Sequence, residues 1–419
     1  MTSPTYNDSP QYLTKEYVGN ILKTYFKDNA LKVLNIETAP ASAKGESYCS
    51  IMTRIKVSYK LEREKVVNEI HFIVKSTYED NPYLFNVLKQ YDVYNTEMQM
   101  YETVFPQLQQ LLYDIGDNDQ LCAKTIHVDH DRDAIIFEDL SVRKFIMVNR
   151  LEGMDEVHIK FCLRKLAKMH ATAAVLNERQ KGLLEKYIHG IFNRNVNCYG
   201  VFFENVIRVC AKFADSCPEL GTYYRDKLLQ LIPHVAEYGT RCYDPNPKHF
   251  LTLNHGDIWT NNVMVQYNDE TGKTNVKDVL LIDFQYCNWT SPAVDLYYFL
   301  CTSTQDDLLF NHLPKLIQYY HQVLSQTLTK LKYQQHIPTL HEFNVQMLER
   351  GFYAVTSLLV NLPLMINDKT EDADFESLLG NDEKAQRFHN VLYTNGRVQR
   401  IIKVMLPRFD QMVLLDVID

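Results

Sequence analysis

"LNHGDIWTNNVMVQYN" (residues 253–268) and "LLIDFQY" (residues 280–286) contain the most informative pattern in this chain. Apolar residues close the first stretch and open the second, and the turn-forming sequence "NDETGK" lies between them. This pattern predicts a β-hairpin. Asp257 and Asn262 lie on the segment that enters the hairpin, and Asp283 lies where its second strand ends. Because a hairpin brings its two ends together, we expect these three side chains to converge.

The order and spacing of these residues indicate a phosphoryl-transfer site. Kinases carry an Asp that accepts or orients the attacking hydroxyl, an Asn five positions later, and a second Asp before a Phe. Asp257, Asn262 and the pair Asp283-Phe284 follow this order. Carboxylate and amide oxygens suit Mg²⁺, which binds through a few protein oxygens together with substrate phosphates. The alternative is that these are ordinary loop residues satisfying backbone donors, which is the better interpretation of any one of them alone.

The composition of the chain excludes several classes of protein. At about 150 residues per domain, 419 residues suggest two or three domains. A net charge of −8 argues against a nucleic-acid partner held through its phosphates. The sequence has no secretory signal and no apolar run near the roughly 20 residues that span a bilayer. Its nine cysteines are scattered without zinc-binding spacing, so we expect a reduced, cytoplasmic protein.

Strand patterns dominate the first third of the chain, and helical patterns dominate the rest. "SIMTRIKVSYK" (50–60), "EIHFIVKS" (69–76) and "DAIIFEDL" (133–140) are typical of strands, while residues 14–28 and about 85–104 are typical of helices, the second ending at Pro106. We therefore predict an α+β fold. Residues 1–140 would form a small ATP-binding lobe with an antiparallel sheet that ends in a hinge. Residues 141–419 would form a larger, mostly helical lobe with the catalytic hairpin and the acceptor site.

A kinase also needs a lysine for the nucleotide phosphates and a glutamate that pairs with this lysine. Lys75 ends the strand-like run "HFIVK", and its alternation points it away from the apolar face of the strand. Glu97 follows on a predicted helix and shares a face with Tyr94 and Tyr101. Glu102 is a nearby rival, and a solvated helical glutamate is the alternative interpretation of Glu97.

Two further segments are candidates for nucleotide contacts. The carbonyl of Glu138 and the amide N–H of Leu140 stand where a hinge would bind the adenine, although any strand-to-loop junction has similar groups. A loop covering the phosphates is expected within "AKGESYCS" (43–50), where the contacts would come from Ser47, Cys49 and Ser50. Gly45 is the only glycine of this loop, so the expected glycine-rich pattern is missing.

The stretch "SPAVDLYYFL" (291–300) places Asp295 at the start of an apolar helix. Two interpretations stand side by side. A buried Asp295 would accept hydrogen bonds from the backbone of the catalytic loop and hold it rigid. Alternatively, it is a simple acidic residue that the dipole of the helix N-terminus favours.

Three longer stretches resemble the ecdysteroid kinase-like family, an arthropod-rich branch of the choline-kinase-like and aminoglycoside-phosphotransferase-like enzymes. They are "FEDLSVRKFIMVNRLEGMDEVHIKFCLRKLAKMHATAAVL", "NHGDIWTNNVM" and "LIDFQYCNWTSPAVDLYYFL". The resemblance extends over nearly the whole chain. It implies a protein-kinase-like bilobal fold and Mg²⁺-dependent transfer from ATP to the hydroxyl of a small molecule. It implies the following roles: Asp257 as catalytic base, Asn262 and Asp283 as metal ligands, Lys75 and Glu97 as the phosphate-holding pair, and Glu138 to Leu140 as the hinge.

Three functions remain open from the sequence. The first is a kinase for an ecdysteroid or a similar lipophilic alcohol, including hydroxylated foreign compounds that are detoxified in this way. The second is a kinase for a cationic alcohol of the choline or aminoglycoside type, which the acidic run between Asp368 and Glu383 would attract. The third is a pseudokinase that binds lipophilic ligands. No activation segment ending in Ala-Pro-Glu is recognisable, which argues against a protein substrate.

Overall fold

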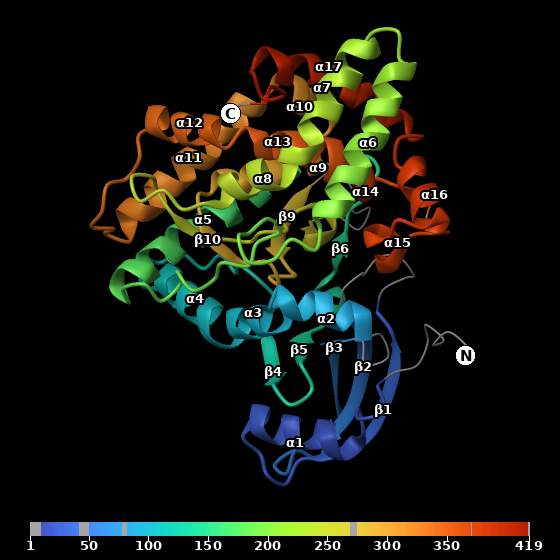
Figure 1. Ribbon diagram of the computed structural model, residues 1–419. Coiled ribbons are helices and arrows are strands. Elements are labelled where there is room, and N and C mark those ends of the chain that lie inside the picture. Colours follow the sequence, from blue (N-terminus) through green and yellow to red (C-terminus); the bar gives the residue numbers. More distant parts are fainter. Residues whose placement is uncertain (1–9, 42–49, 78–81, 269–274, 370, 418–419) are drawn as a thin grey trace. The chain divides into compact units, whose positions relative to one another are not determined.

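The computed structural model describes residues 10–41, 50–77, 82–268, 275–369 and 371–417. The chain divides into two compact units. The first unit comprises Met1–Pro106 and Cys122–Ile146, and the second comprises Gln107–Leu121 and Met147–Asp419. The first unit carries an antiparallel sheet and the second is mostly helical, so the predicted α+β, kinase-like fold is confirmed (Figure 1). The assignment of nucleotide binding to residues 1–140 and of acceptor binding to residues 141–419 stays a prediction.

A five-stranded sheet forms the centre of the first unit. Its strands are β1 (Lys32–Pro40), β2 (Ile51–Lys60), β3 (Asn68–Ser76), β4 (Thr125–Asp129) and β5 (Ala134–Glu138), in the order β1-β2-β3-β5-β4. All neighbours are antiparallel. After β5 come a 3₁₀ turn, η2 (Leu140–Arg143), and the short strand β6 (Phe145–Met147), at which the chain passes into the second unit.

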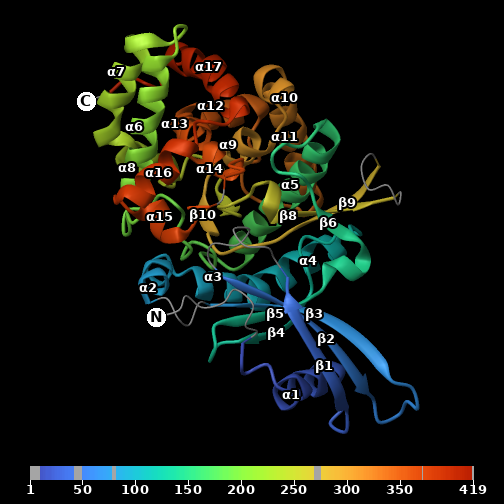
Figure 2. The same cartoon turned by 90° about the vertical axis from the view of Figure 1, so that its right-hand side faces the viewer.

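Helix α1 (Lys15–Phe26) covers one face of this sheet, as both views in Figures 1 and 2 show. The side chain of Thr14 caps its N-terminus by accepting a hydrogen bond from the Tyr17 amide. The buried face of α1 packs on side chains that alternate along β2 and β3, among them Ile55, Val57 and Phe72. The period-2 pattern of the sequence therefore predicted correctly which face of these strands is buried.

A long helical region lies between β3 and β4. It consists of α2 (Pro82–Gln90), α3 (Val93–Gln99), the π-helical turn η1 (Met100–Val104) and α4 (Phe105–Asp114). The prediction that this helix ends at Pro106 is wrong. Pro106 stands in the first turn of α4, where a missing N–H and a fixed φ are tolerated. The π turn directly before it, closed by the Phe105 N–H on the Met100 carbonyl, lets the helix continue.

Helices surround the hairpin in the second unit. The helices are α5 (Glu156–Arg179), α6 (Gly200–Ser216), α7 (Gly221–Leu231), η3 (Ile232–His234), α8 (Val235–Tyr243), α9 (Ala293–Ser303), α10 (Asp306–Asn311), α11 (Leu313–Lys330), α12 (Leu340–Glu349), α13 (Phe352–Thr356), η5 (Ser357–Asn361), α14 (Leu362–Met365), α15 (Phe375–Leu379), α16 (Glu383–Val391) and α17 (Gly396–Gln411). The strands are β7 (Thr252–Asn254), β8 (Val263–Tyr267), β9 (Val276–Leu281) and β10 (Asn288–Thr290). Helix α5 packs against α11 on one side and against β7 and β9 on the other.

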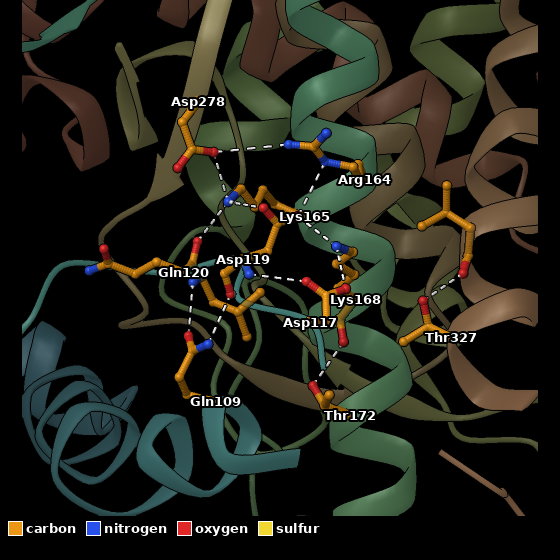
Figure 3. Close-up of polar contacts among 12 residues, drawn as sticks. Gln109, Asp117, Asp119, Gln120, Arg164, Lys165, Lys168, Thr172, Asp278 and Thr327 are labelled. Atoms are coloured by element: carbon orange, nitrogen blue, oxygen red, sulfur yellow. Dashed lines mark hydrogen bonds and ion pairs between the residues drawn. The ribbon is translucent and has the colours of Figure 1, made fainter. Parts of the chain in front are cut away.

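A cluster of buried charges ties β9 to helix α5 (Figure 3). Lys165 is fully buried, and its Nζ donates to the Gln120 carbonyl at 2.8 Å. The same atom pairs with Asp278 on β9 at 2.8 Å and with Asp119 at 3.3 Å. Burial alone would raise the pKa of Asp119, but Lys165 and the neighbouring Lys168 hold that pKa below its usual range. The cluster therefore joins three distant segments of the second unit.

Among the described residues, no helix combines the length and the apolar character needed to cross a bilayer.

Candidate functional site

The predicted hairpin is present in the second unit. Strands β8 and β9 pair antiparallel, with Val263 opposite Leu281 and Val265 opposite Val279. Beyond this register the Ile282 amide donates to the Asn262 carbonyl at 3.1 Å. Asp283 is the next residue, so the pairing of the two strands brings it beside the end of the loop that carries Asp257 and Asn262.

The side chain of Asn262 holds Asp257. Its Nδ2 donates to the Asp257 carbonyl oxygen at 2.7 Å and to Asp257 Oδ2 at 3.1 Å. Asp257 Oδ1 accepts a hydrogen bond from the hydroxyl of Tyr298 at 2.7 Å. Both oxygens of the carboxylate therefore have protein donors. Both of these bonds use the amide nitrogen of Asn262, and its amide oxygen is a neutral donor of the type that Mg²⁺ binds.

Two residues at the site have a left-handed backbone. Gly256 has φ +81°, and a Cβ built on it would lie 2.0 Å from the Tyr286 carbonyl oxygen, so only glycine fits there. Asp283 has φ +69°. A left-handed conformation at a residue other than glycine costs about 1–3 kcal/mol and persists where the surroundings impose it, often at functional sites. The left-handed backbone of Asp283 is therefore imposed by its surroundings.

His255 joins the loop that carries Asp257 and Asn262 to the end of the hairpin. Its buried ring donates from Nε2 to the Ile282 carbonyl at 3.0 Å, while Nδ1 accepts from the Asp257 amide at 3.4 Å. Burial lowers the pKa of His255, although the carboxylates of Asp295 and Asp283 act in the opposite direction. A neutral imidazole with its proton on Nε2 satisfies both hydrogen bonds.

The contacts of Asp295 distinguish its two interpretations, an acceptor for the loop backbone and an acid that only the helix dipole favours. Its fully buried carboxylate accepts from the His255 amide at 2.6 Å and from the Gly256 amide at 2.9 Å. His170 Nε2 lies 3.1 Å from the same carboxylate. Asp295 therefore holds the backbone of the catalytic loop rather than acting only on the helix dipole.

Lys75 and Glu97 pair within the first unit. Lys75 Nζ lies 2.6 Å from Glu97 Oε2, and the two side chains are only 9% and 4% exposed. The rival Glu102 instead pairs with His130 at the surface, where both side chains are about half exposed. The position of Glu97 on the helix face of Tyr94 and Tyr101 thus predicted correctly that Glu97, and not Glu102, pairs with Lys75.

The expected hinge follows β5 in the first unit. Glu138 ends this strand and Leu140, which is buried, begins η2. Between them, Asp139 accepts from Arg54 Nε at 2.7 Å and from the Ser141 amide at 3.0 Å. These contacts fix the conformation of the segment. Ser47, expected to cover the phosphates, lies outside the described residues.

The sequence did not predict the contacts that four further residues make in the second unit: Tyr298, His255, His170 and Lys165. One signal for Tyr298 was available, because it follows Asp295 by three residues on one predicted helix and so shares its face. Lys165 and His170 lie on helix α5 and His255 lies in the loop after β7, and their sequence positions carry no comparable signal.

A kinase-like fold with a carboxylate–amide–carboxylate hairpin defines the class of this protein. The model of the ecdysteroid kinase-like family matches residues 44–333, which is well over half of the chain. The chain therefore belongs to the ecdysteroid kinase-like family, as its resemblance to that family indicated. None of the curated proteins matches it.

Proposed function

We propose that this protein transfers the γ-phosphoryl group of ATP to a hydroxyl of an ecdysteroid or a similar lipophilic alcohol. The arrangement of Asp257 is the observation that carries the proposal. Its carboxylate is oriented at both oxygens, by Tyr298 and Asn262, and its loop is clamped by Asp295. A general base must be held in a fixed orientation toward the hydroxyl whose proton it accepts, and the hydrogen bonds to Asp257 support such a role.

Asp257 accepts the proton of the acceptor hydroxyl, or orients that hydroxyl, as the new O–P bond forms and the bond from Pγ to the bridging oxygen breaks, releasing ADP. Asn262 and Asp283 would hold Mg²⁺ through an amide oxygen and a carboxylate, a donor set that suits this ion. When bound, the metal neutralises charge on the transferred phosphoryl group.

The first unit would bind the nucleotide. In this proposal Lys75 contacts the phosphates of ATP and is kept in place by Glu97, with which it forms a buried ion pair. The Glu138 carbonyl and the Leu140 amide contact the adenine. Ser47 completes the phosphate contacts. The buried position of the Lys75–Glu97 pair supports a specific role, because buried charges are retained only where they are paired.

The acidic run gives less support to a cationic acceptor than its composition suggested. Asp374 pairs with Lys384, and Asp372 pairs with Arg387 at 3.3 Å. Asp374 and Asp382 also cap the N-termini of α15 and α16. Several of these carboxylates therefore have partners within the chain, so this run is a weaker attractor for choline or an aminoglycoside than its composition suggested.

Mass spectrometry of reaction mixtures tests the proposal. The purified protein is incubated with ATP, Mg²⁺ and a panel of ecdysteroids, other hydroxylated steroids and amino alcohols. We expect a phosphorylated ecdysteroid or related alcohol, and Asp257→Asn should reduce its formation by about 10²–10⁴-fold because the amide cannot accept the proton. Nucleotide affinity, measured by calorimetry, should be nearly unchanged in this variant.

Two results would contradict the proposal. If the wild-type protein phosphorylates only amino alcohols, the acceptor class is wrong. If Asp257→Asn transfers phosphate within about ten-fold of the wild-type rate, Asp257 is not the base, since that loss is below the usual contribution of a base.

A further inference from the structure

We propose that Tyr298 is a positioning residue for phosphoryl transfer, which fixes the plane of the Asp257 carboxylate through a hydrogen bond from its hydroxyl. This inference rests on the proposed function of Asp257 and adds to it. The distance from the Tyr298 hydroxyl to Asp257 Oδ1 is 2.7 Å, which is a normal length for a hydrogen bond to a carboxylate.

One turn of helix α9 holds three consecutive residues of the catalytic loop. Asp295 accepts from the backbone amides of His255 and Gly256, and Tyr298 donates to the side chain of Asp257. Residues three apart on a helix share a face, so both anchors point to the loop. The same rigid helix therefore holds both the backbone of the loop and the side chain of Asp257.

The ring of Tyr298 is itself fixed by aromatic packing. It stacks on Tyr353 of α13 with ring centroids 6.1 Å apart and an interplanar angle of 14°. The hydroxyl of Tyr353 bonds to that of Tyr243 on α8 at 2.7 Å. Tyr298 is only 4% exposed, so it has little room to rotate. Rigid neighbours make the hydrogen bond to Asp257 a geometric constraint rather than a transient contact.

Tyr298 stays a donor over the whole working pH range. Burial raises the pKa of its hydroxyl well above 10.0, and the charge of Asp257 and the hydrogen bond to it raise this pKa further. Each carboxylate oxygen can accept two hydrogen bonds, so the bonds from Tyr298 and Asn262 are compatible with a further one from the alcohol. The role of Tyr298 is orientation, since a donor to the carboxylate stabilises its charged form and does not make it a stronger base.

Tyr297 offers a matched control. It is the neighbouring tyrosine on the same helix, and its hydroxyl donates to the Met347 carbonyl at 3.0 Å instead of to the loop. Tyr298→Phe and Tyr297→Phe each remove one buried hydroxyl from α9 and keep the ring. Only the first removes a contact to Asp257.

The test compares steady-state kinetics of the two variants with the wild type, using ecdysone as the acceptor probe and, separately, water as acceptor in ATP hydrolysis. We expect Tyr298→Phe to lower kcat by about 10- to 100-fold, because a misplacement of about 1 Å at the reacting group costs about 100-fold. The KM for ATP and the calorimetric affinity for Mg²⁺-ATP should not change. Tyr297→Phe should match the wild type in all of these values.

The outcomes separate the inference from the function on which it rests. If both variants have the same kcat, or if the lower kcat of Tyr298→Phe only follows a smaller folded fraction in a thermal melt, Tyr298 has no positioning role and the proposed kinase function stands. If the wild-type protein phosphorylates no member of the panel of ecdysteroids, other hydroxylated steroids and amino alcohols and does not hydrolyse ATP, the kinase proposal and the inference fail together. A loss of kcat confined to Tyr298→Phe, with an unchanged melting temperature, supports both.

Discussion

Asp295→Asn replaces a buried carboxylate by an amide of the same shape. The carboxylate accepts one backbone hydrogen bond on each oxygen, from His255 at 2.6 Å and from Gly256 at 2.9 Å. The asparagine side chain has only one oxygen, so its NH₂ group must face one of these two N–H donors. One charge-assisted bond is lost, worth about 1.5–3 kcal/mol, and the remaining bond becomes a neutral one. Because the site is fully buried, water cannot replace the missing acceptor. We expect the free energy of unfolding to fall by about 2–4 kcal/mol.

Equilibrium unfolding in urea, followed by tryptophan fluorescence, measures this loss. The chain has two tryptophans, Trp259 and Trp289, and both belong to the second unit, so the signal reports on the unit that contains Asp295. Asp382→Asn is the control. Asp382 accepts the Ala385 amide at an exposed helix N-terminus, where Asn and Asp are equally good caps, so no measurable loss is expected. If Asp295→Asn costs less than about 1 kcal/mol, the value of an ordinary neutral hydrogen bond, the clamp on the catalytic loop is not charge-assisted and the reasoning is refuted.

Four further changes have expected outcomes. Asp283→Ala should abolish Mg²⁺-dependent ATP binding in calorimetry without unfolding the protein, and retained binding would refute its role as a ligand. Lys75→Met should lower kcat strongly in the kinase assay while the thermal melt still shows a folded protein, and unchanged turnover would mean that another group holds the phosphates. Lys165→Met should destabilise the second unit in urea by up to about 3–5 kcal/mol, the cost of removing one partner of a buried ion pair. The loss should exceed that of Lys168→Met, whose side chain is 13% exposed, and equal losses would contradict this. Burial lowers the pKa of His389 below 6.5, so on acidification the unfolded chain takes up this proton before the folded chain does. The free energy of unfolding should therefore fall as the pH drops below about 6.5. His389→Gln should reduce this pH dependence in urea titrations at several pH values.

Local patterns predicted the parts of the molecule that depend on neighbouring residues. The hairpin that presents Asp283 followed from two apolar runs and a turn sequence, because its register is set by residues close in the chain. The buried face of β2 followed from the two-residue period of its side chains. The order of Asp257, Asn262 and Asp283 indicated their chemistry, because metal-assisted phosphoryl transfer needs these groups in one place.

Contacts between distant segments needed the tertiary structure. The helix face favoured Glu97 over its rival Glu102 as the partner of Lys75, but only the packed structure shows that Glu97 is buried with Lys75 while Glu102 lies at the surface. The helix that continues through Pro106 depends on a π turn that no local propensity signals. Lys165 looks like a solvated helical lysine in the sequence, yet it is fully buried among acceptors from other segments.

Local sequence patterns were enough to predict the class of fold, the hairpin and the residues that we propose as the reacting groups. The tertiary structure decided how these groups are held: Asp295 on the loop backbone, Tyr298 on the carboxylate of Asp257, and Lys165 on strand β9. The physical reason is the range of the interactions. Periodicity and turn chemistry act over a few residues and are written in the local sequence. A buried polar group, in contrast, takes its partner from whichever segment the packed core brings beside it.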